Sequence, residues 1–324
     1  MPGAIGTPHL GARRHIRISQ EATFGTVNPA PSWVYVPILE DGMKLKATSP
    51  RYRPDTNFGG DYRRHVHVCH SLQSSGDIIC NPWPEVTGYL LDMALARTAA
   101  HDLNSYTVDH FTPTDPRRYT GTVIDRLTIA VTGTGDADVR LTLGCVAKLE
   151  AENDDLEEAS FTYAGVTPVP FMFRDAAILI GAIHRIDLEA FTITVENNLA
   201  QGPNVQTAGT EQGTVGYLIA QQRAISLELT ELNVGDTINE AIRDCNPLAF
   251  EARFSHPDGH MWQIQLPYIY PEESDEDGTP SQVTKESPRF EVGCDDGGCD
   301  IIYGVDLAAG GTTTLAELTT TAPA

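Results

Sequence analysis

Strict alternation of apolar and polar residues recurs along most of the chain. Every second position is apolar, with frequent β-branched and aromatic residues, in HVHVCH (65–70), LTIAV (127–131), VRLTLGC (139–145), FTITVEN (191–197), AISLELTEL (224–232), FEARF (250–254) and WQIQLPYIY (262–270). A period of two predicts strands with one buried and one solvated face, the arrangement of antiparallel sheets. The pattern therefore predicts an all-β dominated protein, either a β-sandwich or a partial barrel.

Helical spacing of apolar residues occurs in two short segments, 84–97 and 235–246. The first begins with Pro84 and Glu85, which suit the first turn of a helix, and the second has Asp236 as its N-cap. Each segment has a single apolar stripe, so we expect one short helix to flank the sheet in each half of the chain. The segments rich in Pro, Gly or polar residues predict loops at 41–61, 98–118 and 199–214.

The order of the predicted elements repeats along the chain. In each half, strands precede a helix and a hairpin follows it, and residues 127–145 align with residues 250–268 without a gap. Sequence identity between the two segments is low, so the pattern of elements repeats but the residues themselves do not. Such a repeat of pattern is consistent with an internal duplication. The predicted division is an N-terminal arm with a basic loop (1–61), a first β domain (62–160), a second β domain (161–304) and a C-terminal tail (305–324).

Charge is unevenly distributed along the chain, whose net charge is −22. Residues 1–70 hold nine Lys/Arg and five Asp/Glu, a net of +4, whereas residues 71–324 hold 13 and 39, a net of −26. This asymmetry suggests basic and acidic surfaces that meet between copies of the chain, and ordinary solvated loops are the alternative. The candidate contact residues are Arg13, Arg14, Arg17, Arg51, Arg53, Arg63, Arg64, Asp154, Asp155, Glu157, Glu158, Glu272, Glu273 and Asp275.

Candidate metal ligands occur in HVHVCH, where His65, His67 and Cys69 would point to one face of a strand. The alternative is a strand whose His and Cys side chains face a neighbouring subunit. Cys294 and Cys299 form the one close cysteine pair, which predicts either a disulfide or metal site or a Gly-rich turn with free thiols.

No nucleotide-binding, zinc-protease or serine-hydrolase motif occurs in the sequence. We therefore expect no enzymatic activity and no cofactor. The N-terminus lacks the apolar segment of a signal peptide, and no stretch approaches the about 20 apolar residues of a membrane span. The expectation is a soluble protein made in a cytoplasm.

Four segments, taken in order, resemble a known family. They are ISQEATFGTVNP (18–29), SSGDIICNPWPEVTGYLLDMAL (74–95), HFTPTDPRRYTGTVIDRLTIAV (110–131) and AAILIGAIHRIDLEAFTITVENNLA (176–200). Together they are similar to the tail tube proteins of long-tailed, siphovirus-like bacteriophages. The resemblance implies a β-sandwich with a flanking helix, in which the subunits complete a continuous β-barrel tube.

The resemblance also implies partners and a location. Rings of this chain would stack into a conduit for DNA ejection in the virion tail, assembled in the host cytoplasm without a membrane. The tape measure protein and phage DNA would occupy the lumen, and tail terminator and distal tail proteins would bind the tube ends. Two tube-like halves in one chain favour a trimer over a hexamer. An acidic lumen would repel DNA and let it slide.

Two other functions remain as alternatives. One is a metal-binding β-protein or enzyme that uses the His65, His67 and Cys69 set. The other is a carbohydrate-binding module of the virion surface, for which Trp33, Trp83 and Trp262 are the candidate aromatic residues. The alternating pattern around Trp262 and the helix start beside Trp83 favour a core position for both.

Overall fold

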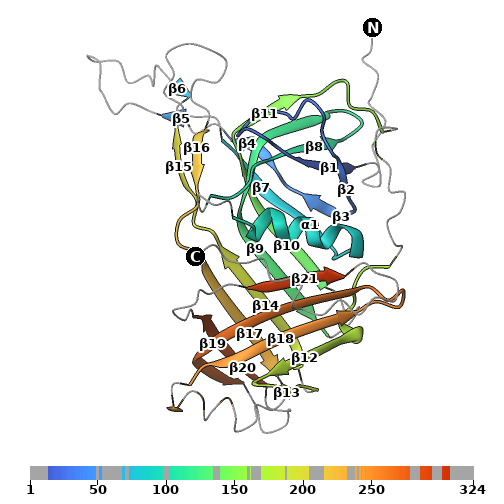
Figure 1. Ribbon diagram of the computed structural model, residues 1–324. Coiled ribbons are helices and arrows are strands. Elements are labelled where there is room, and N and C mark those ends of the chain that lie inside the picture. Colours follow the sequence, from blue (N-terminus) through green and yellow to red (C-terminus); the bar gives the residue numbers. More distant parts are fainter. Residues whose placement is uncertain are drawn as a thin grey trace, which may run out of the picture.

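Antiparallel strands make up most of the computed structural model (Figure 1). The structure describes residues 14–48, 51–52, 68–69, 73–97, 102–133, 139–158, 161, 169–186, 188–203, 215–231, 238, 241, 243–244, 246–277, 285–293 and 301–306. Within these ranges, 17 strands belong to one connected sheet, and two further pairs form separate ribbons. The all-β prediction is confirmed, and the sheet of the single chain is open rather than closed into a barrel.

The sheet has a short first part and a long second part. The first part contains β1 (His15–Gln20), β2 (Val34–Val36), β8 (Tyr106–Phe111), β11 (Leu149–Glu152) and the beginning of β9 (Arg117–Thr132). The second part contains β3 (Ile38–Met43), β4 (Lys46–Thr48), β7 (Gln73–Cys80), β10 (Val139–Ala147) and the rest of β9. Ile16, Ile18 and Val108 from the first part and Ile78, Leu141 and Leu143 from the second belong to one buried core.

The second part of the sheet continues without interruption into the other half of the chain. Strand β14 (Leu188–Glu196) pairs with β9, and β17 (Ala224–Glu231) pairs with β14. Beyond β17 follow β20 (Lys285–Val292), β19 (Met261–Asp277), β18 (Leu248–Ser255), β12 (Ala176–Ile180) and β13 (Ile183–His184). Strand β21 (Ile302–Asp306) pairs with the beginning of β19.

Helix α1 (Pro84–Leu95) confirms the first predicted helix. It buries Val86, Leu90 and Met93 as the spacing predicts, and it ends two residues before the predicted boundary because Ala96 is extended, with φ −68° and ψ 128°. Of the second predicted helix, the described residues Ile238, Ala241, Arg243 and Asp244 are helical, and the two apolar ones are buried.

The two predicted hairpins have the same register. In the first hairpin Val139, Leu141 and Leu143 pair with Val131, Ile129 and Leu127. In the second, Trp262, Ile264 and Leu266 pair with Phe254, Ala252 and Phe250, each residue lying 123 positions after its counterpart. The register shifts just beyond the last of these pairs in both hairpins. All twelve side chains are buried, so both hairpins turn the same face to the core.

Several predicted boundaries are wrong. Strand β8 lies within the predicted loop 98–118, and a 3-10 turn, η3 (Phe173–Asp175), precedes β12. Strand β12 ends where Gly181 and Ala182 adopt left-handed φ values of 57° and 65°. Strand β16 (Val215–Ile219) is separate from β17 and pairs with β15 (Ala200–Pro203), which lies within the predicted loop 199–214.

Candidate functional site

A buried carboxylate organises the N-terminal turn. Glu21 is 7% exposed, and each of its oxygens accepts two hydrogen bonds. Oε2 accepts from the Gly25 N–H and the Ser105 hydroxyl, both at 2.8 Å, and Oε1 accepts from the Thr107 hydroxyl at 2.8 Å and the Gly121 N–H at 2.9 Å. Hydrogen bonds to a charged acceptor are among the stronger ones in proteins. Glu21 therefore joins its own turn to β8 and β9.

Two glycines make this junction possible. Gly25 and Gly121 have φ values of +72° and +63°, which side chains other than that of glycine rarely adopt. A Cβ at Gly25 would lie 2.4 Å from Lys148 Cδ, and one at Gly121 would lie 2.7 Å from Lys148 Cβ. The EATFGT segment and the YTG segment of the sequence resemblance thus meet at one site. Both oxygens of the Glu21 carboxylate already accept hydrogen bonds from within the chain, which indicates a structural role.

A second buried carboxylate lies on β8, two residues after Thr107. Asp109 is fully buried and accepts from Arg17 Nε at 2.9 Å and from Arg118 Nε at 2.6 Å and Nη2 at 2.9 Å. The Arg17 guanidinium also lies 4.3 Å from the centroid of the Trp33 ring. Arg17 is thus engaged within the chain, with its side chain 14% exposed, and Trp33 stacks on it.

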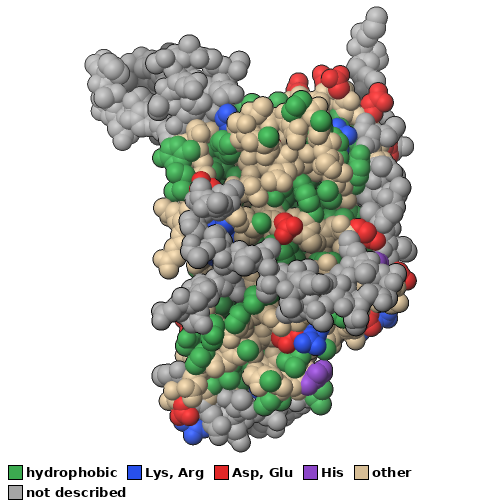
Figure 2. Space-filling model, viewed as in Figure 1, with side chains coloured by type: hydrophobic (Ala, Val, Ile, Leu, Met, Phe, Trp, Pro, Cys, Tyr) green, Lys and Arg blue, Asp and Glu red, His purple; other side chains and the backbone are tan. Residues whose placement is uncertain are grey.

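Part of the acidic run at 150–158 is neutralised locally. The Arg117 guanidinium lies 2.7 Å from Asp115, 3.7 Å from Glu150 and 3.6 Å from Glu152, and hydrogen bonding to Asp115 raises its pKa. The remaining members, Asp154, Asp155, Glu157 and Glu158, are exposed beyond β11. Acidic side chains gather at this end of the molecule in Figure 2.

The other predicted contact residues are only partly described. Arg14 and Glu272 are exposed, Arg51 lies in strand β5 (Arg51–Tyr52), and Glu273 and Asp275 lie in β19. Arg13, Arg53, Arg63 and Arg64 lie outside the described residues. A role of these charged residues in contacts between copies stays a prediction.

The predicted metal ligands are not assembled in the described part of the chain. His65, His67, Cys294 and Cys299 lie outside it, whereas Cys69 lies in strand β6 (Val68–Cys69), paired with β5. Among the described residues no three His, Cys, Asp or Glu side chains form a cluster that could hold a metal ion. Cys80 and Cys145 are buried free thiols, and burial raises the pKa of Cys80 to about 12.

One face of the long second part of the sheet is polar. Asp77 of β7, Gly144 of β10, Arg126 of β9 and Glu196 of β14 lie side by side across four strands. The neighbouring row contains Thr142, Thr128, Thr194 and Ser226, all from strands whose alternate residues form the core. This face, which we call the polar face, is set by the alternation seen in the sequence.

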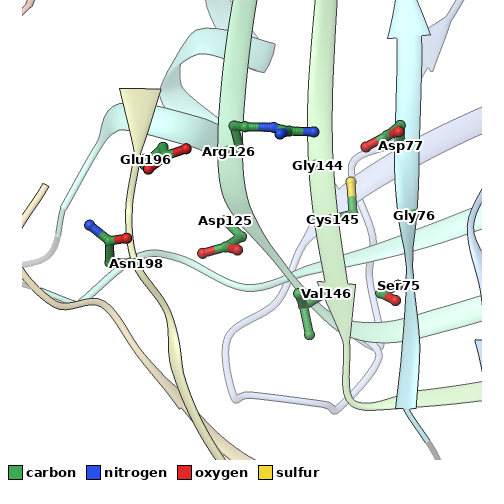
Figure 3. A pocket seen from close by; sticks show the side chains of 10 residues that line it. All are labelled: Ser75, Gly76, Asp77, Asp125, Arg126, Gly144, Cys145, Val146, Glu196 and Asn198. Atoms are coloured by element: carbon green, nitrogen blue, oxygen red, sulfur yellow. The ribbon is translucent and has the colours of Figure 1, made fainter. Parts of the chain in front are cut away.

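A shallow hollow of about 410 Å³ lies on the polar face. Figure 3 shows Arg126 extending over Gly144 toward Asp77, with Glu196 on the other side of Arg126. A Cβ on Gly144 would lie 3.4 Å from Arg126 Cβ and 3.6 Å from Asp77 Oδ1, so the lack of a side chain at this position leaves space between these two charged residues. Asp77 and Glu196 flank Arg126, so acidic and basic groups alternate across the hollow.

Asn197 joins the two halves of the chain. It is fully buried, and its Nδ2 donates to the carbonyls of Ala94 and Ile124, each at 3.0 Å. Its Oδ1 accepts from Arg223 Nε at 3.0 Å, and Arg223 Nη2 donates to the Leu95 carbonyl at 2.7 Å. These bonds satisfy carbonyls at the C-terminal end of α1. No pattern in the sequence indicates this role, although Asn197 lies in the last of the four segments that carry the resemblance.

Comparison with known proteins identifies the family. Residues 11–285 match the family described as phage tail tube protein. A search of curated proteins found no match. In the described part of the chain, no helix has the length and apolar character needed to cross a membrane.

Proposed function

The chain belongs to the phage tail tube protein family, and from this premise we propose that its rings stack into the tube through which phage DNA leaves the capsid. The observation that carries the proposal is the long antiparallel sheet, which has one covered face and one polar face. An open sheet leaves edge strands that favour pairing with another chain. Pairing around a ring would remove those edges and close a barrel.

The polar face is proposed to line the lumen. The opposite face carries the core, the first part of the sheet and helix α1, so it belongs on the outside of a closed barrel. Short Thr and Ser side chains leave the interior open, and Asp77 and Glu196 repel phosphate. Because Arg126 lies between these two acids, the proposed wall is mixed in charge rather than purely acidic at this position.

The two hairpins of equal register support two tube-like domains, residues 62–160 and 161–304. Three such chains would provide six similar units, so we propose a trimeric ring with pseudo-sixfold symmetry. Mass measurement of isolated rings and top views of the tube by electron microscopy test this stoichiometry. Six chains per ring would contradict it.

The proposed stacking contacts are the charged residues of the N-terminal and acidic segments. Reversal of Arg51, Arg53, Arg63 and Arg64 to Glu is expected to stop polymerisation and to leave the subunit folded. Tubes of normal length from this variant would refute the stacking role. The tape measure protein and DNA in the lumen, and the terminator and distal tail proteins at the tube ends, are the partners this function requires.

Negative-stain electron microscopy of the purified protein tests the function directly. Tubes with a central channel are the expected result. A protein that remains monomeric at all concentrations and salt conditions would contradict the proposal. Elemental analysis of the same sample tests the metal-binding alternative, for which about one equivalent of zinc or copper is the expected content.

A further inference from the structure

The outer edge of the second hairpin is covered by β12. Residues 176–180 of β12 pair antiparallel with residues 250–254 of β18, whose other edge pairs with β19. Ile178 and Ile180 of β12 are buried in the core. Without β12, the backbone of β18 would present an open edge to other chains.

The first hairpin has a different strand on the equivalent edge. Residues 250–254 of β18 lie 123 positions after residues 127–131 of β9, which pair antiparallel with residues 191–195 of β14. Ile193 of β14 is opposite the central residue of this stretch of β9, as Ile178 of β12 is opposite that of β18. Strand β12 therefore takes on β18 the place that β14 takes on β9.

The strand that corresponds to β14 in the first half is β4. Strand β14 pairs with β17, the last described strand before the second helical segment, and β4 pairs with β7, the last described strand before α1. Among the described strands β4 pairs with β7 alone, so it leaves an open edge at the end of the strand order opposite to β12. Figure 1 shows β4 and β12 in these separate positions. If the contact between chains repeats the contact of β9 with β14, it joins β18 to β4 of the next copy.

Strand β12 is held less extensively than β14. It forms five residue pairs with β18, whereas β14 forms seven with β9. The turn after β12 contains Ala182, whose φ of 65° is unfavourable for a residue other than glycine. Beyond this turn, Ile183 and Ile186 remain 47% and 84% exposed. Release of the β12–β13 hairpin therefore breaks few pairs and allows the strained turn to relax.

We infer that β12 is a stand-in strand that blocks the edge of β18 in the free subunit, and that β4 of a neighbouring copy displaces it as the ring forms. The inference rests on the proposed tube function. In the free subunit the covered edge suppresses premature pairing between chains. A ring that retained β12 would contain an extra strand at each contact between chains, so this contact would differ from that of β9 with β14.

A reversible disulfide between β12 and β18 tests the displacement. In Ala177→Cys/Arg253→Cys the two cysteines are directly opposite each other, a separation that suits a disulfide. The matched control, Ala130→Cys/Thr192→Cys, joins the equivalent positions of β9 and β14, which stay paired in the ring. The oxidised test variant is expected to yield at least tenfold fewer tubes in electron micrographs, and reduction of its disulfide is expected to restore them. The control is expected to form normal tubes in both states. Normal tubes from the oxidised test variant, with the disulfide verified by peptide mapping, would overturn the inference.

Hydrogen exchange of the unmodified protein provides a second readout, which decides the matter if the reduced cysteine variant does not assemble. The amides of β4 are expected to exchange at least tenfold more slowly in the tube than in the free subunit, and those of β12 at least tenfold faster. An unchanged rate in either strand would overturn the inference. If the unmodified protein itself forms no tubes, the proposed function fails. That result is distinct from failure of the displacement, in which tubes form with β12 still paired to β18.

Discussion

Removal of the Glu21 carboxylate is expected to destabilise the subunit strongly. In Glu21→Ala, the N–H groups of Gly25 and Gly121 lose their acceptor, whereas the hydroxyls of Ser105 and Thr107 can rotate to other partners. An unsatisfied buried amide costs about 1–3 kcal/mol, so two amides predict a loss of about 2–6 kcal/mol in the free energy of unfolding. Glu21→Gln retains one accepting oxygen and turns an NH2 group toward the other donors, so about half of this loss is expected.

Urea unfolding followed by near-ultraviolet circular dichroism measures the effect. The protein concentration must be low enough to keep the chain monomeric, because ring formation would add to the apparent stability. Glu157→Ala is the matched control, since Glu157 is an exposed acid on the loop after β11 and its loss is expected to change stability by no more than about 0.5 kcal/mol. A loss below about 1 kcal/mol in Glu21→Ala would refute the reasoning that the four bonds act together.

Three other changes test separate features. Gly121→Ala is expected to cost more than about 1 kcal/mol in thermal unfolding, because φ is +63° and the new methyl group meets Lys148. Asp109→Asn leaves Arg17 and Arg118 without their carboxylate, so a loss of about 3–5 kcal/mol is expected in urea unfolding. Burial lowers the pKa of His110 to about 4, so stability should fall as the pH drops from about 6.5 to about 4, where only the unfolded chain gains a proton. His110→Phe should reduce this slope by up to about 1.4 kcal/mol per pH unit, whereas an unchanged slope would contradict the assignment.

The hairpins and the first helix could be predicted because each shows its period in the sequence. Alternation in LTIAV and VRLTLGC identified the buried residues of β9 and β10, and the spacing of Val86, Leu90 and Met93 identified α1. Trp262 is fully buried and stacked on Phe254 at 4.7 Å, as its alternation with apolar neighbours predicted. These features depend on local pattern and on burial of one face.

The missed elements depend on distant partners. Strand β8 carries Asp109 at a buried position, a charge that sequence patterns place on the surface, and only Arg17 and Arg118 from two other strands make it stable there. Likewise, the break between β16 and β17 has no local signal, because Arg223 leaves the strand to bond Asn197 and the end of α1. The role of Glu21 was hidden for the same reason, since its donors lie on β8 and β9 as well as in its own turn.

The pairing of β9 with β14 has a consequence for how the proposed ring assembles. This seam between the two halves forms as the polypeptide folds. A contact between separate chains costs about 4–15 kcal/mol in translational and rotational entropy, and this seam does not incur that cost during assembly. The effective concentration of one half at the other is set by the chain and does not fall on dilution. Three seams of a six-unit ring would therefore survive any dilution that separates the chains. Because the two halves need not be identical, each can also evolve a different surface without breaking the ring.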